Sequence, residues 1–139
     1  MLDTIRDFGQ NGAALLIGLS VGAAWIAAIV SPNTSYDHLS AKQAEKHVRE
    51  LLKSASDPIA VILLVAAGLA ILGGATVSGI LSLISAAGFF SNRWTLASIK
   101  SGDGKEEAPG KTQRILAVSL TLLFGLAAAA AAILAVLGV

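Results

Sequence analysis

The chain has 139 residues, of which 55% are hydrophobic and only 14% charged, with a formal net charge of +1 and no cysteine. So few charges exclude an ordinary soluble domain, in which about 25% of residues are charged. The near-neutral balance excludes a strongly basic surface for nucleic acid. The charges are also segregated, since residues 8–31, 58–92 and 115–139 carry none. Apolar runs of this length are typical of membrane-spanning helices, and we therefore predict an integral membrane protein in contact with the lipid bilayer.

The first predicted span covers residues 12–30. Ser31 and Pro32 are expected to end it, because proline disfavours helical geometry in the residue before it. The N-terminal segment lacks the positive region and the small-residue cleavage site of a secretory signal, so we expect this span to be retained. Trp25 lies in the middle of the span, away from the usual interfacial aromatic belt. It is therefore expected to face other helices.

The most polar part of the chain contains a predicted amphipathic helix over residues 41–55. Ser40 and Gln43 have the spacing of a capping box at its start. Apolar residues then follow one helical stripe, and lysine, arginine and glutamate occupy most of the other positions. Such a helix lies on a membrane surface or packs against the rest of the protein or a partner. Asp57 and Pro58 suit the N-cap and first turn of a new helix.

The uncharged residues 59–91 cross the membrane either once or twice. As one helix they would be about 50 Å long, whereas a hydrocarbon core of about 30 Å accommodates only about 40 Å even at a steep tilt. Two crossings fit better if the second extends into the mostly apolar residues 92–99. The Gly73-Gly74 pair is a strong turn signal between them. We therefore predict spans over residues 58–73 and 76–97.

Lysine and arginine are distributed unequally between the two sides that four spans would create. The termini and the Gly-Gly turn would share a side with one basic residue, Arg6, and nine would lie on the other. These nine are Lys42, Lys46, Arg49, Lys53, Arg93, Lys100, Lys105, Lys111 and Arg114. With three spans the split would be six against four. Because cytoplasmic loops are enriched in lysine and arginine, we favour four spans in the inner cell membrane, with both termini outside and loops 31–57 and 98–112 in the cytoplasm.

The remaining part of the chain consists of a loop and a last span. Glycine, proline and charged residues alternate over residues 99–112, which is typical of a flexible connector. The last span, over residues 113–137, contains a run of alanines that lets neighbouring backbones approach closely in lipid. The predicted fold is a single all-α membrane domain, a bundle of four transmembrane helices with one amphipathic cytoplasmic helix between the first two spans.

Gly18 and Gly22 form a GxxxG pattern within the first span. Small residues at this spacing let two helices pack closely in a membrane. The pattern therefore predicts a helix-packing face. This face serves either the bundle of this chain or an association with other membrane protein subunits or a second copy.

A weakly polar stripe runs along the third span, with Ser78, Ser82 and Ser85 at successive helical turns and Asn92 continuing the row. One interpretation is helix packing, with each hydroxyl bonded to a carbonyl one turn back. The other is the wall of a pore or polar cavity. No acidic or basic residue joins the stripe, so proton relay by buried charge is not indicated.

His38 and His47 are the only histidines of the chain. Their spacing matches no established ligand pattern for a metal or haem, so we interpret them as solvated side chains. The sequence has no nucleophile elbow, P-loop or HExxH motif. We therefore predict no catalytic residue, no cofactor and no metal site.

Two segments, "LIGLSVGAAWIAAIVSP" and "YDHLSAKQAEKHVRELL", carry a resemblance to a known family. A small-residue-rich span ending in proline, then a short alanine-rich helix, then a tight pair of spans resembles the small four-span family related to transmembrane protein 205. The resemblance covers roughly residues 15–98 and rests on pattern. It implies a four-helix bundle and no particular reaction.

Two functional hypotheses follow from these patterns. The first is a non-enzymatic membrane component, an accessory, assembly or scaffold subunit that acts through helix packing. It is favoured because the predicted spans offer small residues for close packing and no ionisable side chain for an ion path. The alternative is a small homo-oligomeric channel or transporter lined by the serine stripe.

Overall fold

The computed structural model describes residues 1–96, 99–100, 106–107 and 111–139 of the chain. Its elements are the helices α1 (Leu2–Trp25), η1 (Ile26–Val30), α2 (Ser31–His38), α3 (Ala41–Leu72), α4 (Thr76–Thr95) and α5 (Lys111–Val136), and the strands β1 (Ile99–Lys100) and β2 (Glu106–Glu107). The two strands pair antiparallel. The described part of the chain is thus almost entirely helical.

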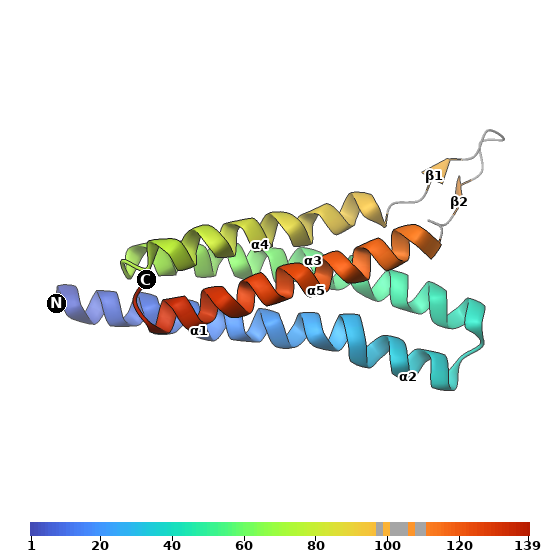
Figure 1. The fold of residues 1–139 in the computed structure, drawn as a ribbon, viewed down its shortest axis with the longest axis horizontal. Coiled ribbons are helices and arrows are strands. Elements are labelled where there is room, and N and C mark those ends of the chain that lie inside the picture. Colours follow the sequence, from blue (N-terminus) through green and yellow to red (C-terminus); the bar gives the residue numbers. More distant parts are fainter. Residues whose placement is uncertain (97–98, 101–105, 108–110) are drawn as a thin grey trace.

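The four long helices pack side by side in a closed ring. α1 packs on α3, α3 on α4, α4 on α5, and α5 returns to α1. Both termini and the turn between α3 and α4 lie at one end, while α2 and the strands lie at the other (Figure 1). The core is built largely from alanines at 0% exposure, including Ala13, Ala60, Ala86, Ala128 and Ala131. Small side chains let the helix backbones approach one another closely.

Three helical segments are long and apolar enough to cross a membrane: Leu2–His38, Ala41–Leu72 and Arg114–Val136. This supports the prediction of a membrane protein. α4 is not among these three segments. Its serines, together with Asn92 and Arg93 at its C-terminal end, lower its mean hydropathy, although it packs between α3 and α5.

The first span does not end at Ser31 and Pro32, as the sequence predicts; the helical backbone continues to His38. A π-helical segment, η1, precedes the proline, and the Ser31 N–H donates to Ile26 O, five residues back. In an α-helix the proline ring would clash with the carbonyl four residues earlier. The wider π turn gives that ring room, so the helix bends but does not stop.

The predicted helices over residues 41–55 and 58–73 form one helix, α3, with Pro58 inside it. The structure therefore corrects the prediction of a separate amphipathic helix over residues 41–55. Leu52 and Ile59, on either side of the proline, are both buried against the rest of the bundle. Packing on both sides keeps the two halves in one helix, although Pro58 removes one backbone hydrogen bond. The apolar stripe of the first half, with Ala44 and Val48 buried, packs against this protein.

The predicted turn at Gly73 and Gly74 is confirmed. Gly74 has a φ of +79°, a conformation that side chains disfavour. Gly73 lies directly against α1, where an added Cβ would come within 2.7 Å of Gln10 N. The side chain of Gln10 donates from Nε2 to Gly73 O at 2.8 Å, which fixes the turn to α1.

The first helix begins at Leu2, ten residues before the predicted start of the first span at residue 12. The remaining predicted boundaries agree closely with the structure where it can be compared. α4 ends at Thr95 and α5 covers Lys111–Val136. The end of the predicted third span falls on residues 97–98, and most of the predicted loop over residues 99–112 also lies outside the described residues. Within that loop the structure describes β1, β2 and the first two residues of α5.

Candidate functional site

The predicted serine stripe is enclosed by the bundle. Ser78, Ser82, Ser85 and Asn92 all have an exposure of 0%. Ser78 Oγ donates to Ala131 O of α5 at 2.7 Å, across the interface and not to a carbonyl one turn back. Among the described residues, Ser82 Oγ and Ser85 Oγ have no hydrogen-bond partner. The stripe therefore faces the interior of this chain and not its surface.

Asn92 forms the centre of a polar cluster that joins three helices. Its Nδ2 lies 3.0 Å from Ser56 Oγ on α3 and 2.9 Å from Thr121 Oγ1 on α5. Ser56 and Thr121 are both 2% exposed. Sequence analysis did not identify these two partners, because a lone serine or threonine in an apolar helix carries no signal of its own.

The hydroxyl groups fix the orientation of the Asn92 amide. Ser56 Oγ donates to Leu52 O at 2.6 Å, and Thr121 Oγ1 donates to Ala117 O at 2.8 Å. Both hydroxyl protons are thus committed, so each oxygen can only accept from Asn92. An NH₂ group supplies the two donors that this arrangement requires. Asn92 Oδ1 then points away from both hydroxyls, and it has no partner among the described residues.

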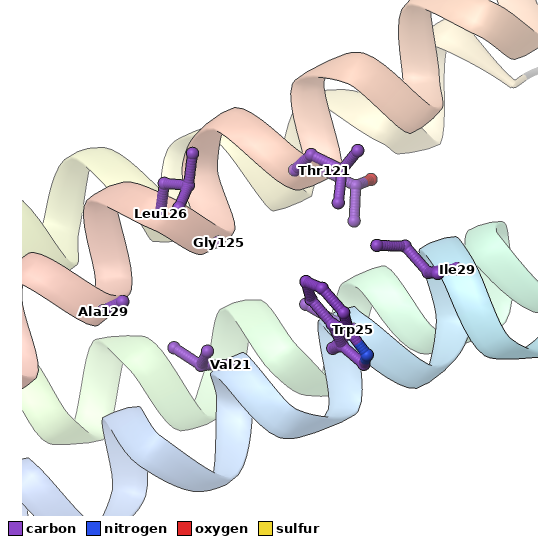
Figure 2. A pocket seen from close by; sticks show the side chains of 9 residues that line it. Val21, Trp25, Ile29, Thr121, Gly125, Leu126 and Ala129 are labelled. Carbon is purple, nitrogen blue, oxygen red and sulfur yellow. The ribbon is translucent and has the colours of Figure 1, made fainter.

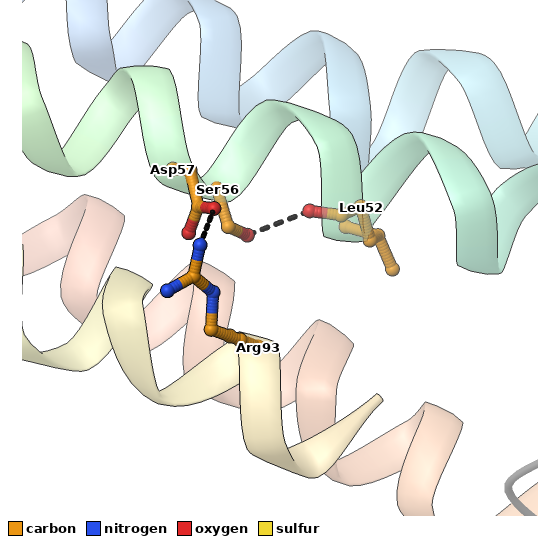
Figure 3. A network of polar contacts seen from close by, with 4 residues as sticks. All are labelled: Leu52, Ser56, Asp57 and Arg93. Atoms are coloured by element: carbon orange, nitrogen blue, oxygen red, sulfur yellow. Dashed lines mark hydrogen bonds and ion pairs between the residues drawn. The ribbon is translucent and has the colours of Figure 1, made fainter. Parts of the chain in front are cut away.

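An ion pair lies beside this cluster, at the margin of the apolar region. Arg93 Nη2 is 2.9 Å from Asp57 Oδ2 (Figure 3). Figure 3 also shows the neighbouring Ser56 hydroxyl on Leu52 O. Because both charged side chains are partly exposed, this pair adds little to stability. It does bring together α3 and α4 at the ends of their uncharged segments.

A second charged cluster connects α2, α3 and α5 at the end of the bundle opposite the termini. Arg114 Nη1 lies 3.0 Å from Glu45 Oε1 and donates to Tyr36 Oη at 2.6 Å. The guanidinium carbon lies 5.9 Å from the centre of the Tyr36 ring, within the range of a cation–π contact. Arg114 thereby ties α5 to both α2 and α3.

The predicted packing face at Gly18 and Gly22 points outward. Both glycines are exposed, and a Cβ built on either would meet nothing within 4 Å. No helix described in this chain covers them. The sequence left open whether the two glycines pack within the bundle or against another chain. In this structure they do not pack against the described helices of the bundle.

Trp25 does not face other helices in the way that the sequence predicts; its side chain is 58% exposed. It lies beside a pocket of about 370 Å³ between α1 with η1 and α5. Figure 2 shows Val21, Trp25 and Ile29 on one wall and residues of α5 on the other. The lining residues are Val21, Ala24, Trp25, Ile29, Thr121, Leu122, Gly125, Leu126 and Ala129. The only polar side chain apart from the indole is that of Thr121, whose hydroxyl is already bonded.

His38 and His47 lie on different elements and are both exposed. His38 ends α2, and His47 lies in the first half of α3. Among the residues that the structure describes, no group of three or more histidine, aspartate or glutamate side chains is placed to hold a metal ion. The described residues therefore provide no set of metal ligands around either histidine.

Comparison of the chain with protein-family models, with curated proteins and with solved structures finds no match. The resemblance to the four-span family related to transmembrane protein 205 therefore stays an expectation from the sequence. Any functional assignment rests on the polar cluster around Asn92, the outward glycine face and the pocket at Trp25.

Proposed function

We propose that the protein is a non-catalytic integral membrane component that spans the bilayer four times and acts by packing against other membrane helices, as an accessory, assembly or scaffold subunit. α4 then crosses the membrane as the third span, although its hydropathy is the lowest of the four. Its serine stripe and Asn92 face inward, where neighbouring helices and not lipid surround them. A helix of this kind is compatible with a membrane if its polar groups are sheltered.

The proposed topology has both termini outside and the two long connections in the cytoplasm. It is supported by the arrangement of the ends, since the termini and the Gly73-Gly74 turn lie together (Figure 1). In this topology Arg6 is the basic residue on the side of the termini and the turn, and the order of the spans along the sequence assigns the other nine lysines and arginines to the cytoplasmic side. This asymmetry is what the enrichment of cytoplasmic loops in basic residues predicts.

The observation that carries the packing role is the exposure of Gly18 and Gly22. A GxxxG pair gives a flat surface on which a second helix can approach closely. None of the helices that the structure describes covers this surface. A partner helix, from another subunit or a second copy, is the occupant that the chemistry of this face fits.

The channel alternative receives less support. A pore between copies of the chain would need the serine stripe at the surface of the bundle, and all four residues of the stripe are fully buried. Lining such a pore would require the bundle to open. The helix-packing role needs no such rearrangement.

The test is a double substitution, Gly18→Leu with Gly22→Leu, compared on native gels with the unmodified protein in mild detergent. We expect the complex to become smaller while membrane insertion is unchanged, because leucine side chains keep the partner helix at a distance. Gly68→Leu is the matched control, since Gly68 is also exposed on a helix with nothing within 4 Å of its Cβ position. An unchanged complex in the double variant would exclude the first span as the partner surface.

A further inference from the structure

The pocket beside Trp25 lies at a depth that only hydrophobic molecules reach. Its walls come from residues 21–29 and 121–129, and both lie within uncharged segments of membrane-spanning length. The neighbouring outward side chains, Ile26, Leu123 and Leu126, are large, apolar and exposed. In the membrane this face adjoins hydrocarbon. The pocket is therefore open to lipid and not to water.

The length and the lining of the pocket suit a hydrocarbon chain. Each wall covers nine residues, so the pocket extends about 12 Å along the helices, and its volume is about 370 Å³. The lining is apolar except for the indole of Trp25 and the hydroxyl of Thr121, which is already bonded. A hydrocarbon chain can fill such a pocket without leaving a polar group of its own unpaired.

One end of the pocket leads toward a region with more basic than acidic side chains. Along α5, Arg114 lies two turns before Thr121; along the other wall, Tyr36 lies two turns after Ile29. Their side chains meet at 2.6 Å. Arg114 is paired with Glu45, and Asp37 follows Tyr36, so the excess of basic residues comes from residues 41–53 of α3, which carry four basic and two acidic side chains. Lys42, Lys46 and Lys53 are exposed, and Lys46 lies 4.0 Å from Glu50. Basic side chains beside membrane helices attract anionic head groups.

We propose that the pocket between α1, η1 and α5 binds an acyl chain of an anionic phospholipid, with the head group at the Arg114 end near the lysines of α3. Trp25 forms the side of the chain-binding groove, and the π turn of η1 helps to shape it. π-helical turns are often found at functional sites. The proposal rests on the membrane topology proposed above and not on the association of Gly18 and Gly22 with another helix.

The test uses Trp25 as a reporter. The chain has two tryptophans, so Trp94→Phe leaves Trp25 as the only one. This variant is reconstituted in phosphatidylcholine vesicles with a minor fraction of phosphatidylglycerol, and either lipid is brominated along its acyl chains. We expect brominated phosphatidylglycerol to quench Trp25 at a relative affinity about fivefold higher than brominated phosphatidylcholine at the same fraction, which is the effect of one basic side chain near an anionic lipid. Equal quenching by the two lipids would overturn the proposal.

Substitutions that fill the pocket provide a second test of the lipid-binding proposal. Gly125→Leu is expected to remove the preference for phosphatidylglycerol; a Cβ there meets only Ala24 Cβ at 3.9 Å. Ala129→Leu fills the same pocket and serves as the second variant if the first is poorly folded by circular dichroism. Gly68→Leu, outside the pocket, should keep the preference. A preference that survives both filling variants would overturn the assignment to this pocket.

The same variants separate this proposal from the packing role. Gly18→Leu with Gly22→Leu should leave the lipid preference intact, and Gly125→Leu should leave the complex size on native gels unchanged. If Gly125→Leu instead reduces the complex size and Trp25 is not quenched by either lipid, a protein side chain fills the pocket and the lipid proposal is wrong.

Discussion

Asn92 shows how one polar side chain can order three helices inside a membrane protein. Each of its two amide protons has a hydroxyl acceptor on a different helix, and each of those hydroxyls gives its own proton to a backbone carbonyl one turn back. Away from water, every such bond replaces an unsatisfied polar group. Measured interhelical hydrogen bonds in membranes average about 0.6 kcal/mol and reach about 1.7 kcal/mol.

We expect Asn92→Ala to lower the free energy of unfolding in micelles by about 1–2 kcal/mol, because two interhelical hydrogen bonds are lost. Asn92→Asp should also lower it, since a carboxyl group offers one donor when protonated and none when ionised, whereas the two hydroxyl oxygens can only accept. Urea or SDS titration followed by circular dichroism measures the difference. Ser91→Ala, which removes only a local bond to Gly88 O, is the control. An Asn92→Asp variant as stable as the original protein would contradict the orientation derived for the amide.

The start of α4 illustrates how an element can depend on a distant segment. Its N-cap residue, Ala75, has no side chain able to cap the helix. Instead, a backbone oxygen of Val139 accepts from Val77 N at 2.8 Å and from Ser78 N at 3.4 Å. Without an acceptor, these first N–H groups of the helix would be unsatisfied. The residues that follow α5 thereby complete the start of α4.

Deleting residues 137–139 should therefore destabilise the start of α4. Leu137 and Val139 are 68% and 46% exposed, so their removal exposes little apolar area. We expect a loss of about 1 kcal/mol, the usual effect of losing a cap, and faster hydrogen exchange at Val77 and Ser78. Adding Ala75→Ser to the truncated chain supplies a side-chain cap and should restore part of the protection. Unchanged exchange at both amides would show that Val139 does not cap the helix.

On the scale of the whole molecule, the ends of the four helices form two groups, one at each end of the bundle. α1 and the turn after α3 meet at close range, because Gly9 and Gly73 have no side chains between them: an added Cβ on Gly9 would lie 2.7 Å from Gly73 N. The hydrogen bond from Gln10 to Gly73 O holds the same contact. The turn therefore stays at the end of the bundle that carries both termini.

Single cysteines can test the resulting topology, because the chain has none of its own. Thr76→Cys and Lys46→Cys are suitable, since both positions are exposed. In intact cells an impermeant maleimide should label Thr76→Cys, whereas Lys46→Cys should react only after permeabilisation. Labelling of both positions from the same side, or protection of Thr76→Cys by lipid, would exclude a hairpin that crosses the membrane twice.

The sequence predicted most of the helices, because their signals are local. Gly73 and Gly74 indicated the turn by conformational preference alone, and the long uncharged segments indicated the membrane by composition alone. Pro32 and Pro58 misled the prediction for the opposite reason. Proline weakens a helix locally, but a π turn at the first site and packing around the second keep the helix continuous.

The candidate site was predictable only in part. The sequence placed Ser78, Ser82, Ser85 and Asn92 on one face of α4, but it could not tell whether that face lines a pore or a core. Helical spacing shows which residues share one face of a helix, but it does not show which neighbouring helix that face contacts. Ser56, Thr121 and the pocket at Trp25 lie between helices far apart in the chain, so no local pattern reveals them.

By itself the sequence determined that the protein is helical and belongs in a membrane, since hydropathy, charge segregation and turn residues act over a few residues each. Only the tertiary structure decided which faces are covered. It buries the serine stripe, leaves Gly18 and Gly22 open and exposes Trp25 beside a pocket. The physical reason is that all four helices are apolar on most sides, so hydrophobicity does not choose a packing face. Close contact between small residues and the hydrogen bonds of Asn92 choose it instead.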